Sequence, residues 1–347
     1  MILLLGASGF IGSAFATELH RRQIPFVPLA RAQLDYTRFD HLLACLRRQR
    51  PTFVINAAGY TGKPNVDACE TARADTLLGN SLLPQTVAHA CAAAEIPWGH
   101  VSSGCIFSGA KIAADSAPST AATLLPRPAT HGRGEGRGEE RPPPKPLLTR
   151  IEKDFTRPDL RALVDRDPAA LHGFTEDDEP NFTFRDPPCS FYSGTKALGE
   201  EALATSPHTY IWRLRIPFDE FDNPRNYLTK LQRYARVYDN VNSLSHRADF
   251  ARAALDLWER RAPFGTYHVT NPGFITTRQV IALLEKILRP ARPFAFWESD
   301  AEFYQLAAKT PRSNCVLDVS KLLATGVRLR PVTEALEHSL RHWQPAA

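Results

Sequence analysis

The chain has 347 residues, 43% of them hydrophobic and 10% aromatic, as expected of a globular protein with one large or two unequal domains. A net charge of +5 is small for this length and does not favour a nucleic-acid partner. The six cysteines show neither a Cys-x-x-Cys pair nor zinc-ligand spacing with histidine, which favours a reducing compartment over a disulfide framework. No stretch reaches the roughly 18 apolar residues that a membrane helix needs, so we expect a soluble, cytoplasmic protein without a membrane partner.

The first hundred residues alternate short apolar runs with amphipathic segments. Buried strands are expected at 2–5, 26–30, 52–58 and 98–103, with helices at 10–22, 39–49 and 76–94. This alternation is typical of βαβ units. The predicted fold class is therefore α/β, with a Rossmann-type doubly wound parallel sheet.

The alternation breaks between about 110 and 175. Residues 129–146 are rich in Gly, Pro, Arg and Glu, and Arg alternates with Glu without aromatic residues, which predicts a solvated loop rather than an RNA contact. Residues 156–173 predict one short helix. We expect an NAD(P)-binding Rossmann domain over 1–215, with 110–175 as a partly solvated insertion. Residues 216–347 are expected to form mainly a smaller C-terminal substrate-binding lobe.

The segment GASGFIG follows the first predicted strand and opens the first predicted helix. Gly6 permits a tight turn, Gly9 lets the backbone approach a pyrophosphate, and Gly12 lets the helix pack on the strand. The amide N–H groups at the helix N-terminus would face the phosphates. In this context the segment favours a dinucleotide site over a plain connection, and the expected loop contacts also include Ser8, Phe10 and Ile11.

The end of the second predicted strand distinguishes the two nicotinamide cofactors. An NAD site usually has an acidic residue there, whereas this chain has Arg31. A guanidinium pairs with a 2′-phosphate, so NADP is favoured and NAD stays possible; the alternative is a surface arginine in a loop. Asp35 is then expected to meet the adenine.

Tyr192 and Lys196 are spaced to share one face of a helix. An ammonium beside a phenol lowers the phenol's pKa, so we expect Tyr192 to act as an acid or base near neutrality. Tyr-x-x-x-Lys alone is common by chance. Joined to the glycine loop and to a strand that ends in serine, it makes a three-part pattern.

With these three parts the sequence resembles the extended short-chain dehydrogenase/reductase superfamily. The resemblance implies that Tyr192 exchanges the proton of the reacting oxygen and that Lys196 holds the nicotinamide ribose. Ser103 then bonds the same oxygen, with Ser102 as the fallback. It also implies that the cofactor is flanked by the NAAG turn and a helical asparagine, namely Asn56, Ala57, Ala58, Gly59 and Asn80.

Further blocks sharpen the resemblance. NAAGYTGKPNVDACE, GCIF, EDDEPNF, SFYSGTKA, NPRNYLTK, VTNPG and PRSNCVLD are similar, in this order, to blocks of the dTDP-4-dehydrorhamnose reductase-like proteins. Among these the chain most resembles the bifunctional nucleotide-rhamnose synthases, which are epimerase-reductases. The blocks extend from residue 2 to about 320 and leave out 110–175.

This resemblance implies a UDP- or dTDP-linked 4-keto-6-deoxyhexose that NADPH reduces at C4 after epimerisation at C3 and C5. Cys105 and Lys230 fall on the positions of the acid/base pair for epimerisation. Because side chains two apart on a strand share a face, Ser103 and Cys105 are both expected to point at the sugar. The alternative is that Cys105 is a small buried core residue.

Three other residues are candidate substrate ligands. Thr61 lies in the first block, Arg312 is suited to grip a pyrophosphate bidentately, and Asn226 to bond the sugar or nucleotide; the latter two are equally compatible with structural roles. Asp67 and Glu70 are expected to cap or orient the loop after the NAAG turn. No metal site is expected, because the histidines lack ligand spacing.

Three functions stay open at this point. The first is the epimerase-reductase. The second is a 4-reductase alone, or a related nucleotide-sugar epimerase or dehydratase. The third is a non-catalytic NADP-binding regulatory subunit, against which the intact Ser103, Tyr192 and Lys196 argue. A homodimer is possible.

Overall fold

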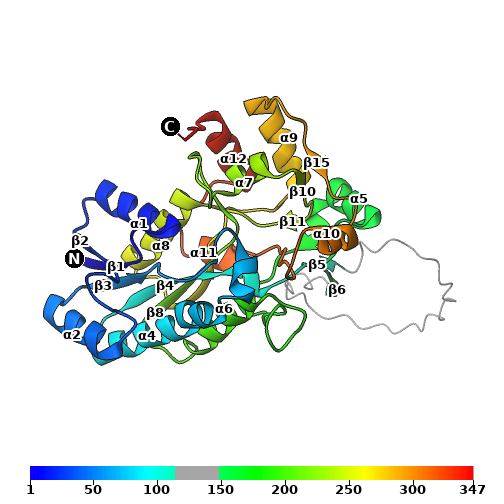
Figure 1. Ribbon diagram of the computed structural model, residues 1–347. Helices are drawn as coiled ribbons and strands as arrows, with labels where there is room; N and C mark the ends of the chain where they lie inside the picture. Colours follow the sequence, from blue (N-terminus) through cyan, green and yellow to red (C-terminus); the bar gives the residue numbers. More distant parts are fainter. Residues whose placement is uncertain (114–147, 347) are drawn as a thin grey trace, which may run out of the picture.

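The computed structural model describes residues 1–113 and 148–346 (Figure 1). The solvated loop predicted at 129–146 lies outside these described residues. Within them, no helix is long and apolar enough to cross a lipid bilayer.

The centre of the molecule is a six-stranded parallel sheet, which confirms the predicted fold class. Its strands run in the order β2, β1, β3, β4, β8, β13. Their bounds are β1 Ile2–Leu5, β2 Phe26–Leu29, β3 Phe53–Asn56, β4 Trp98–Ser103, β8 Thr209–Leu214 and β13 Gly265–His268. The order reverses between β1 and β3, and a ligand of an open parallel sheet sits at the carboxyl ends of the strands beside such a reversal.

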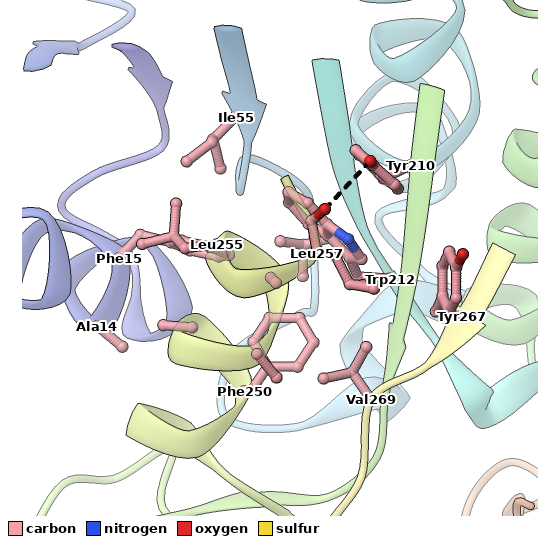
Figure 2. Close-up of a cluster of buried hydrophobic side chains, with 14 of the residues drawn as sticks. Ala14, Phe15, Ile55, Tyr210, Trp212, Phe250, Leu255, Leu257, Tyr267 and Val269 are labelled. Atoms are coloured by element: carbon pink, nitrogen blue, oxygen red, sulfur yellow. Dashed lines mark hydrogen bonds between the residues drawn. The ribbon is translucent and has the colours of Figure 1, made fainter. Parts of the chain in front are cut away.

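Helices cover both faces of the sheet because alternate residues of each strand point to opposite sides. Leu3 and Leu5 face a cluster with α2 (Phe39–Gln49) and α4 (Leu83–Ala93), and Ile2 and Leu4 face α1 (Phe10–Arg21) and α8 (Arg247–Glu259). Figure 2 shows the cluster on the side of α1 and α8. In it the ring of Phe15 of α1 packs against Trp212 of β8 and against Phe250 of α8. The helix α6 (Phe191–Glu201) packs beside α3 (Arg73–Leu77) and the π-helical turn η2 (Leu78–Leu82).

A smaller lobe has its own core between α7 (Tyr227–Arg233), α9 (Thr277–Leu288) and α12 (Val332–Arg341). Its remaining elements are β9 Pro217–Phe218, β10 Arg236–Val237, β11 Val241–Asn242, β12 Ser245–His246, β14 Ile275–Thr276, β15 Ala295–Phe296, α10 Asp300–Leu306 and α11 Ser320–Ala324. The boundary predicted near 215 does not separate the two cores completely. Residues 247–268 return to the sheet, because α8 buries an apolar face on it and β13 pairs with β8.

The described part of the 110–175 insertion is folded rather than loop-like. Three antiparallel strands form a small sheet: β5 (Ala110–Ala113), β6 (Leu148–Glu152) and β7 (Leu171–His172). Between β6 and β7 in the chain lies α5 (Pro158–Arg166), which confirms the short helix predicted at 156–173. Leu160 and Val164 of α5 pack with Val241 and Val316 of the smaller lobe. Short 3₁₀ turns complete the fold: η1 Val66–Glu70, η3 Gly104–Ile106 and η5 Pro168–Ala170.

Candidate active site

The glycine loop has the geometry that the sequence predicts. Gly6 adopts φ +76°, and a Cβ there would lie 2.6 Å from the amide nitrogen of Ala58 in the NAAG turn. A Cβ on Gly12 would lie 2.0 Å from the Gly6 carbonyl oxygen, so only glycine lets α1 approach the turn. Ser8 and Gly9 are exposed at the crest of the loop, at the β1/β3 reversal of the sheet. The backbone therefore fits a dinucleotide pyrophosphate.

Arg247 of α8 holds this loop from the side. Its guanidinium donates to the Phe10 carbonyl (2.9 Å) and lies 4.6 Å from the centre of the Phe10 ring. Ile11 is half-buried and packs against the core between α1 and α8. The loop is thus fixed before any cofactor arrives.

Arg31 and Asp35, the two residues expected near the adenosine, differ in whether their side chains already have hydrogen-bond partners. Arg31 is exposed and makes no hydrogen bond or ion pair with the residues that the structure describes. Asp35 is also exposed, but its Oδ1 accepts bonds from the Thr37 amide (3.1 Å) and hydroxyl (2.5 Å). Arg31 is therefore available to a 2′-phosphate, whereas Asp35 is engaged in a local turn.

Ser103, Tyr192 and Lys196 come together at the carboxyl end of β4. The Ser103 hydroxyl lies close enough to the Tyr192 phenol to lower its pKa, and Lys196 is 5% exposed one helical turn farther along α6. A Cβ on Gly59 would lie 3.5 Å from the Lys196 ammonium, so the lysine reaches the turn that flanks the predicted cofactor site. The Ser190 side chain caps α6 by accepting from the Ser193 amide (3.1 Å), which fixes the turn that carries Tyr192.

The electrostatics of Tyr192 differ from the prediction. Burial raises the pKa of the Tyr192 phenol, and the neighbouring thiols of Cys105 and Cys69 raise it further. The hydrogen bond from Ser103 and the charge of Arg215 act in the opposite direction without reversing the shift. The expectation of a pKa lowered by Lys196 is therefore wrong for this structure, because desolvation outweighs the nearby charges. Tyr192 is held as a protonated phenol, which suits a proton donor.

Cys105 lies beside this group, just after the strand. It is 5% exposed in η3, its amide donates to the Ser103 hydroxyl (3.2 Å), and the neighbouring side chains of Ser103 and Ser193 lower the pKa of its thiol. Burial raises the pKa of the Cys105 thiol, while the charges of Arg215 and Lys196 lower it. Cys105 is thus both packed in an apolar cluster and in contact with the polar groups of the site.

Ser102 is excluded as the fallback by a buried network that the sequence did not predict. Its hydroxyl donates to Glu200 of α6 (2.5 Å), and Glu200 pairs through both oxygens with Arg213 of β8 (2.6 to 3.1 Å). A further guanidinium nitrogen of Arg213 donates to Nε2 of His268 (3.1 Å). The network ties α6, which carries Tyr192, to three strands of the sheet.

Asn80 has a bracing role. It has no exposed surface, and its side chain bonds the amide (3.0 Å) and carbonyl (2.8 Å) of Tyr60 and the Thr195 hydroxyl (3.3 Å). These contacts join the loop after the NAAG turn to α6. Asn56 acts similarly within its own turn, since its Oδ1 accepts from the Ala58 amide (3.1 Å).

Three cations gather on the lobe side of the site, and we call Arg225, Lys230 and Arg312 the cation cluster. Burial lowers the pKa of Lys230, and the charges of Arg225 and Arg312 lower it further. Arg225 donates to the Thr61 hydroxyl. Arg312 is already paired, because both oxygens of Asp67 accept from its guanidinium (2.6 and 2.8 Å). The cluster suits a diphosphate, which would have to compete with Asp67 for Arg312.

Asn226 is not placed to bond a ligand. It has no exposed surface, and its Nδ2 donates to the Asp219 side chain (2.8 Å) and to the carbonyls of Asp219 (2.9 Å) and Phe221 (2.7 Å). Its Oδ1 caps α7 by accepting from the Leu228 amide (3.0 Å). The substrate contact expected of Asn226 is therefore replaced by a structural one, which positions the helix that carries Lys230.

Glu70 orients α6, in line with the expectation for the loop after the NAAG turn. Its Oε1 accepts from the Phe191 amide (2.8 Å) and from the Thr310 hydroxyl (2.7 Å).

Beside Arg312, a cavity of about 360 Å³ opens between the two lobes of the chain. Its wall includes Tyr238 and Tyr304 of the smaller lobe and Lys153 and Asp154 of the insertion, so the insertion borders the site. Among the described residues no group of three or more His, Cys, Asp or Glu side chains could hold a metal ion.

Comparison with known proteins matches the model of one family, the RmlD substrate binding domain, to residues 1–140 and 167–344. A bifunctional dTDP-4-dehydrorhamnose 3,5-epimerase/dTDP-4-dehydrorhamnose reductase of Arabidopsis thaliana is 27% identical over 335 residues, 96% of this chain and 90% of that protein. A trifunctional UDP-glucose 4,6-dehydratase/UDP-4-keto-6-deoxy-D-glucose 3,5-epimerase/UDP-4-keto-L-rhamnose-reductase of the same plant is 26% identical over 92% of this chain. The chain spans only 39% of that trifunctional protein.

Solved structures share the fold. The UDP-rhamnose synthase of Acanthamoeba polyphaga mimivirus superposes with a TM-score of 0.75 and 21% identity over 98% of both chains. A dTDP-4-dehydrorhamnose reductase of Clostridium acetobutylicum superposes with a TM-score of 0.69 and 19% identity over 98% of both chains.

Proposed function

The chain belongs to the RmlD substrate-binding-domain family, and on that premise we propose that it is an NADPH-dependent reductase of a nucleotide-linked 4-keto-6-deoxyhexose. The observation that supports this most strongly is that Tyr192 and the buried Lys196 lie one turn apart on α6, beside Ser103 at the carboxyl end of β4. A UDP or dTDP diphosphate would meet the cation cluster. The similarity to the plant and viral nucleotide-rhamnose enzymes agrees with this substrate class.

Reduction at C4 needs a proton for the carbonyl oxygen as the hydride arrives. When bound on the glycine loop, NADPH supplies that hydride. Tyr192, held protonated by burial, donates its proton to O4, and the Ser103 hydroxyl orients the same oxygen. Lys196, beside the Gly59 turn, would hold the ribose, and its charge would stabilise the tyrosinate left behind. Arg31 would bind the 2′-phosphate.

We further propose that the same site epimerises C3 and C5 before reduction. The C4 ketone acidifies both C–H bonds, and inversion needs a base on one face of the ring and an acid on the other. Burial and two neighbouring arginines favour the neutral amine of Lys230, while burial favours the thiol of Cys105. Lys230 therefore removes the carbon-bound proton, the electron pair moves into the C4 carbonyl as an enolate, and the Cys105 thiol delivers a proton from the opposite face.

The reductase assignment is tested with Tyr192→Phe. Loss of a positioned general acid is expected to slow reduction by about 10²–10⁴-fold while NADPH still binds. Tyr267→Phe is the matched control, because Tyr267 is 1% exposed in β13 and its hydroxyl bonds the Pro263 carbonyl away from the site. A Tyr192→Phe enzyme that reduces the keto sugar within a few-fold of wild type contradicts the assignment.

The epimerase assignment is tested without NADPH, in D₂O, with UDP- and dTDP-linked 4-keto-6-deoxyglucose followed by NMR. Wild type is expected to place deuterium at C3 and C5. Cys105→Ala is expected to abolish exchange yet still reduce a sugar epimerised beforehand, whereas Cys91→Ala, a buried thiol of α4, is expected to leave exchange intact. If wild type reduces the pre-epimerised sugar but incorporates no deuterium, the protein is a 4-reductase alone.

A further inference from the structure

Arg215 is a buried cation at the reacting centre. It follows β8 directly, and its neighbour Leu214 pairs in register with Ser103 of β4. The two strands therefore end side by side, with Arg215 next to the segment that carries Cys105. Arg215 is 6% exposed, and its charge acts on Cys105, Tyr192 and Cys315.

No carboxylate neutralises this charge within the part of the chain that the structure describes. One terminal nitrogen of Arg215 donates to the Asn242 side chain (2.8 Å) and to the Ser313 carbonyl, and Nε–H has no acceptor. Arg213, two residues earlier and within β8, is by contrast paired with both oxygens of Glu200. Burying a charge without a counter-charge costs several kcal/mol, so an unneutralised guanidinium here must be offset by other interactions.

The surroundings of Cys105 show which charge Arg215 faces. The ionisable groups that act on Cys105, or on which it acts, are Lys196, Arg215, Tyr192 and three further thiols, Cys69, Cys189 and Cys315. Only Lys196 and Arg215 in this set are cations. Lys196 acts from α6, beside the Gly59 turn, and Arg215 acts from the end of β8, so the two cations belong to different elements.

We propose that Arg215 supplies the positive charge against which Cys105 ionises, and that it is a positioning residue for the epimerisation. This rests on the proposed function. When the Cys105 S–H bond breaks and the proton passes to C3 or C5, a thiolate is left in an apolar cluster. The fixed guanidinium stabilises that thiolate until a proton returns to it. The buried Nε–H has no acceptor among the described residues, so this donor of Arg215 is not already used.

The test measures the ionisation of Cys105 directly, without substrate. Wild type, Arg215→Gln and Arg215→Lys are treated with methyl methanethiosulfonate from pH 6 to 10.5, and modification of Cys105 is followed by peptide mass spectrometry. Removing a cation near an ionising group shifts its pKa by about 1–3 units, so the midpoint for Arg215→Gln is expected to rise by about one unit or more. At a fixed pH below the midpoint, modification is then about tenfold slower or worse.

Two further variants make the result decisive. Arg215→Lys keeps the charge and is expected to stay nearer to wild type than Arg215→Gln does. Arg341→Gln removes an exposed cation of α12 that pairs with Glu337 outside the site, and is expected to leave the midpoint unchanged. Equal midpoints for wild type and Arg215→Gln overturn the proposal. If Arg215→Gln does not fold, Arg215→Met takes its place as the variant without the charge, and a midpoint equal to that of wild type again overturns the proposal.

The deuterium exchange separates this proposal from the proposed function. If wild type does not exchange C3 and C5 protons, the epimerase is contradicted, while the Cys105 midpoint still reports on Arg215. If wild type exchanges, Arg215→Gln is expected to exchange at least about tenfold more slowly at pH 7, because its Cys105 thiol is a weaker acid, and Arg215→Lys is expected to stay nearer to the wild-type rate. Equal losses of exchange in Arg215→Gln and Arg215→Lys count against the role of the charge.

Discussion

The buried pair of Arg213 and Glu200 gives a prediction of stability that follows from its surroundings. The side chains are 7% and 9% exposed, and three hydrogen bonds of 2.6 to 3.1 Å join them. Replacing Glu200 by leucine removes the carboxylate and leaves a guanidinium in the interior. Breaking a buried pair in this way costs about 3–5 kcal/mol, a large share of the roughly 5–15 kcal/mol that holds a typical domain folded.

The matched variant separates the charge from the shape. In Glu200→Leu with Arg213→Met both charges are gone and similar volumes remain, so most of the lost stability is expected to return. The measurement is urea unfolding of wild type, each single variant and the double variant, followed by tryptophan fluorescence, since Trp98 and Trp212 are buried in the sheet. The reasoning is refuted if Glu200→Leu unfolds within about 1 kcal/mol of wild type, or if the double variant is no better than the single ones.

Three further outcomes are expected. Arg31→Ala should weaken NADPH binding far more than NADH binding in fluorescence titrations, and equal losses would show that Arg31 does not read the 2′-phosphate. Gly12→Ala, which places a Cβ 2.0 Å from the Gly6 carbonyl oxygen, should weaken binding of both cofactors, and unchanged titrations would contradict the packing argument. Burial and the charge of Arg213 lower the pKa of His268 to about 3, so the unfolded chain takes up the proton between about pH 6.5 and 3 while the native state does not. The free energy of unfolding should therefore decrease as the pH is lowered through this window, by up to about 1.4 kcal/mol per pH unit for this group. In His268→Gln, the free energy of unfolding measured in urea should depend less steeply on pH.

The parts of the site that the sequence predicted are those in which a short segment determines its own geometry. The glycine loop needs only the close approaches at Gly6 and Gly12, both of which are local. Ser103 was predicted to face the sugar because it ends a strand, and the carboxyl ends of parallel strands meet at one edge. Tyr192 was placed by helical spacing, but its raised pKa required knowledge of how deeply α6 is buried.

The parts that the sequence did not predict depend on contacts between distant residues. Nothing near Arg215 in the chain indicates that it lacks a carboxylate partner, since its neighbours come from around residues 242 and 313. The same holds for Asp67, which takes the bidentate contact with Arg312 that was expected of a pyrophosphate. Asn226 was misassigned because a capping side chain and a ligand-binding side chain look alike in sequence.

The return of α8 and β13 to the sheet constrains how the protein can be made and divided. During synthesis β8 exists before its outer neighbour, which is complete only once His268 has been added. Until then β8 is an open edge, and Tyr210 and Trp212 lack the helix that covers them. A fragment that ends near residue 215 would keep β8 as an unpaired edge strand and is expected to aggregate, because such an edge can pair with another chain. The parts of the chain before and after residue 215 are therefore not separable modules, and recombining them from different relatives requires carrying residues 247–268 with the first part.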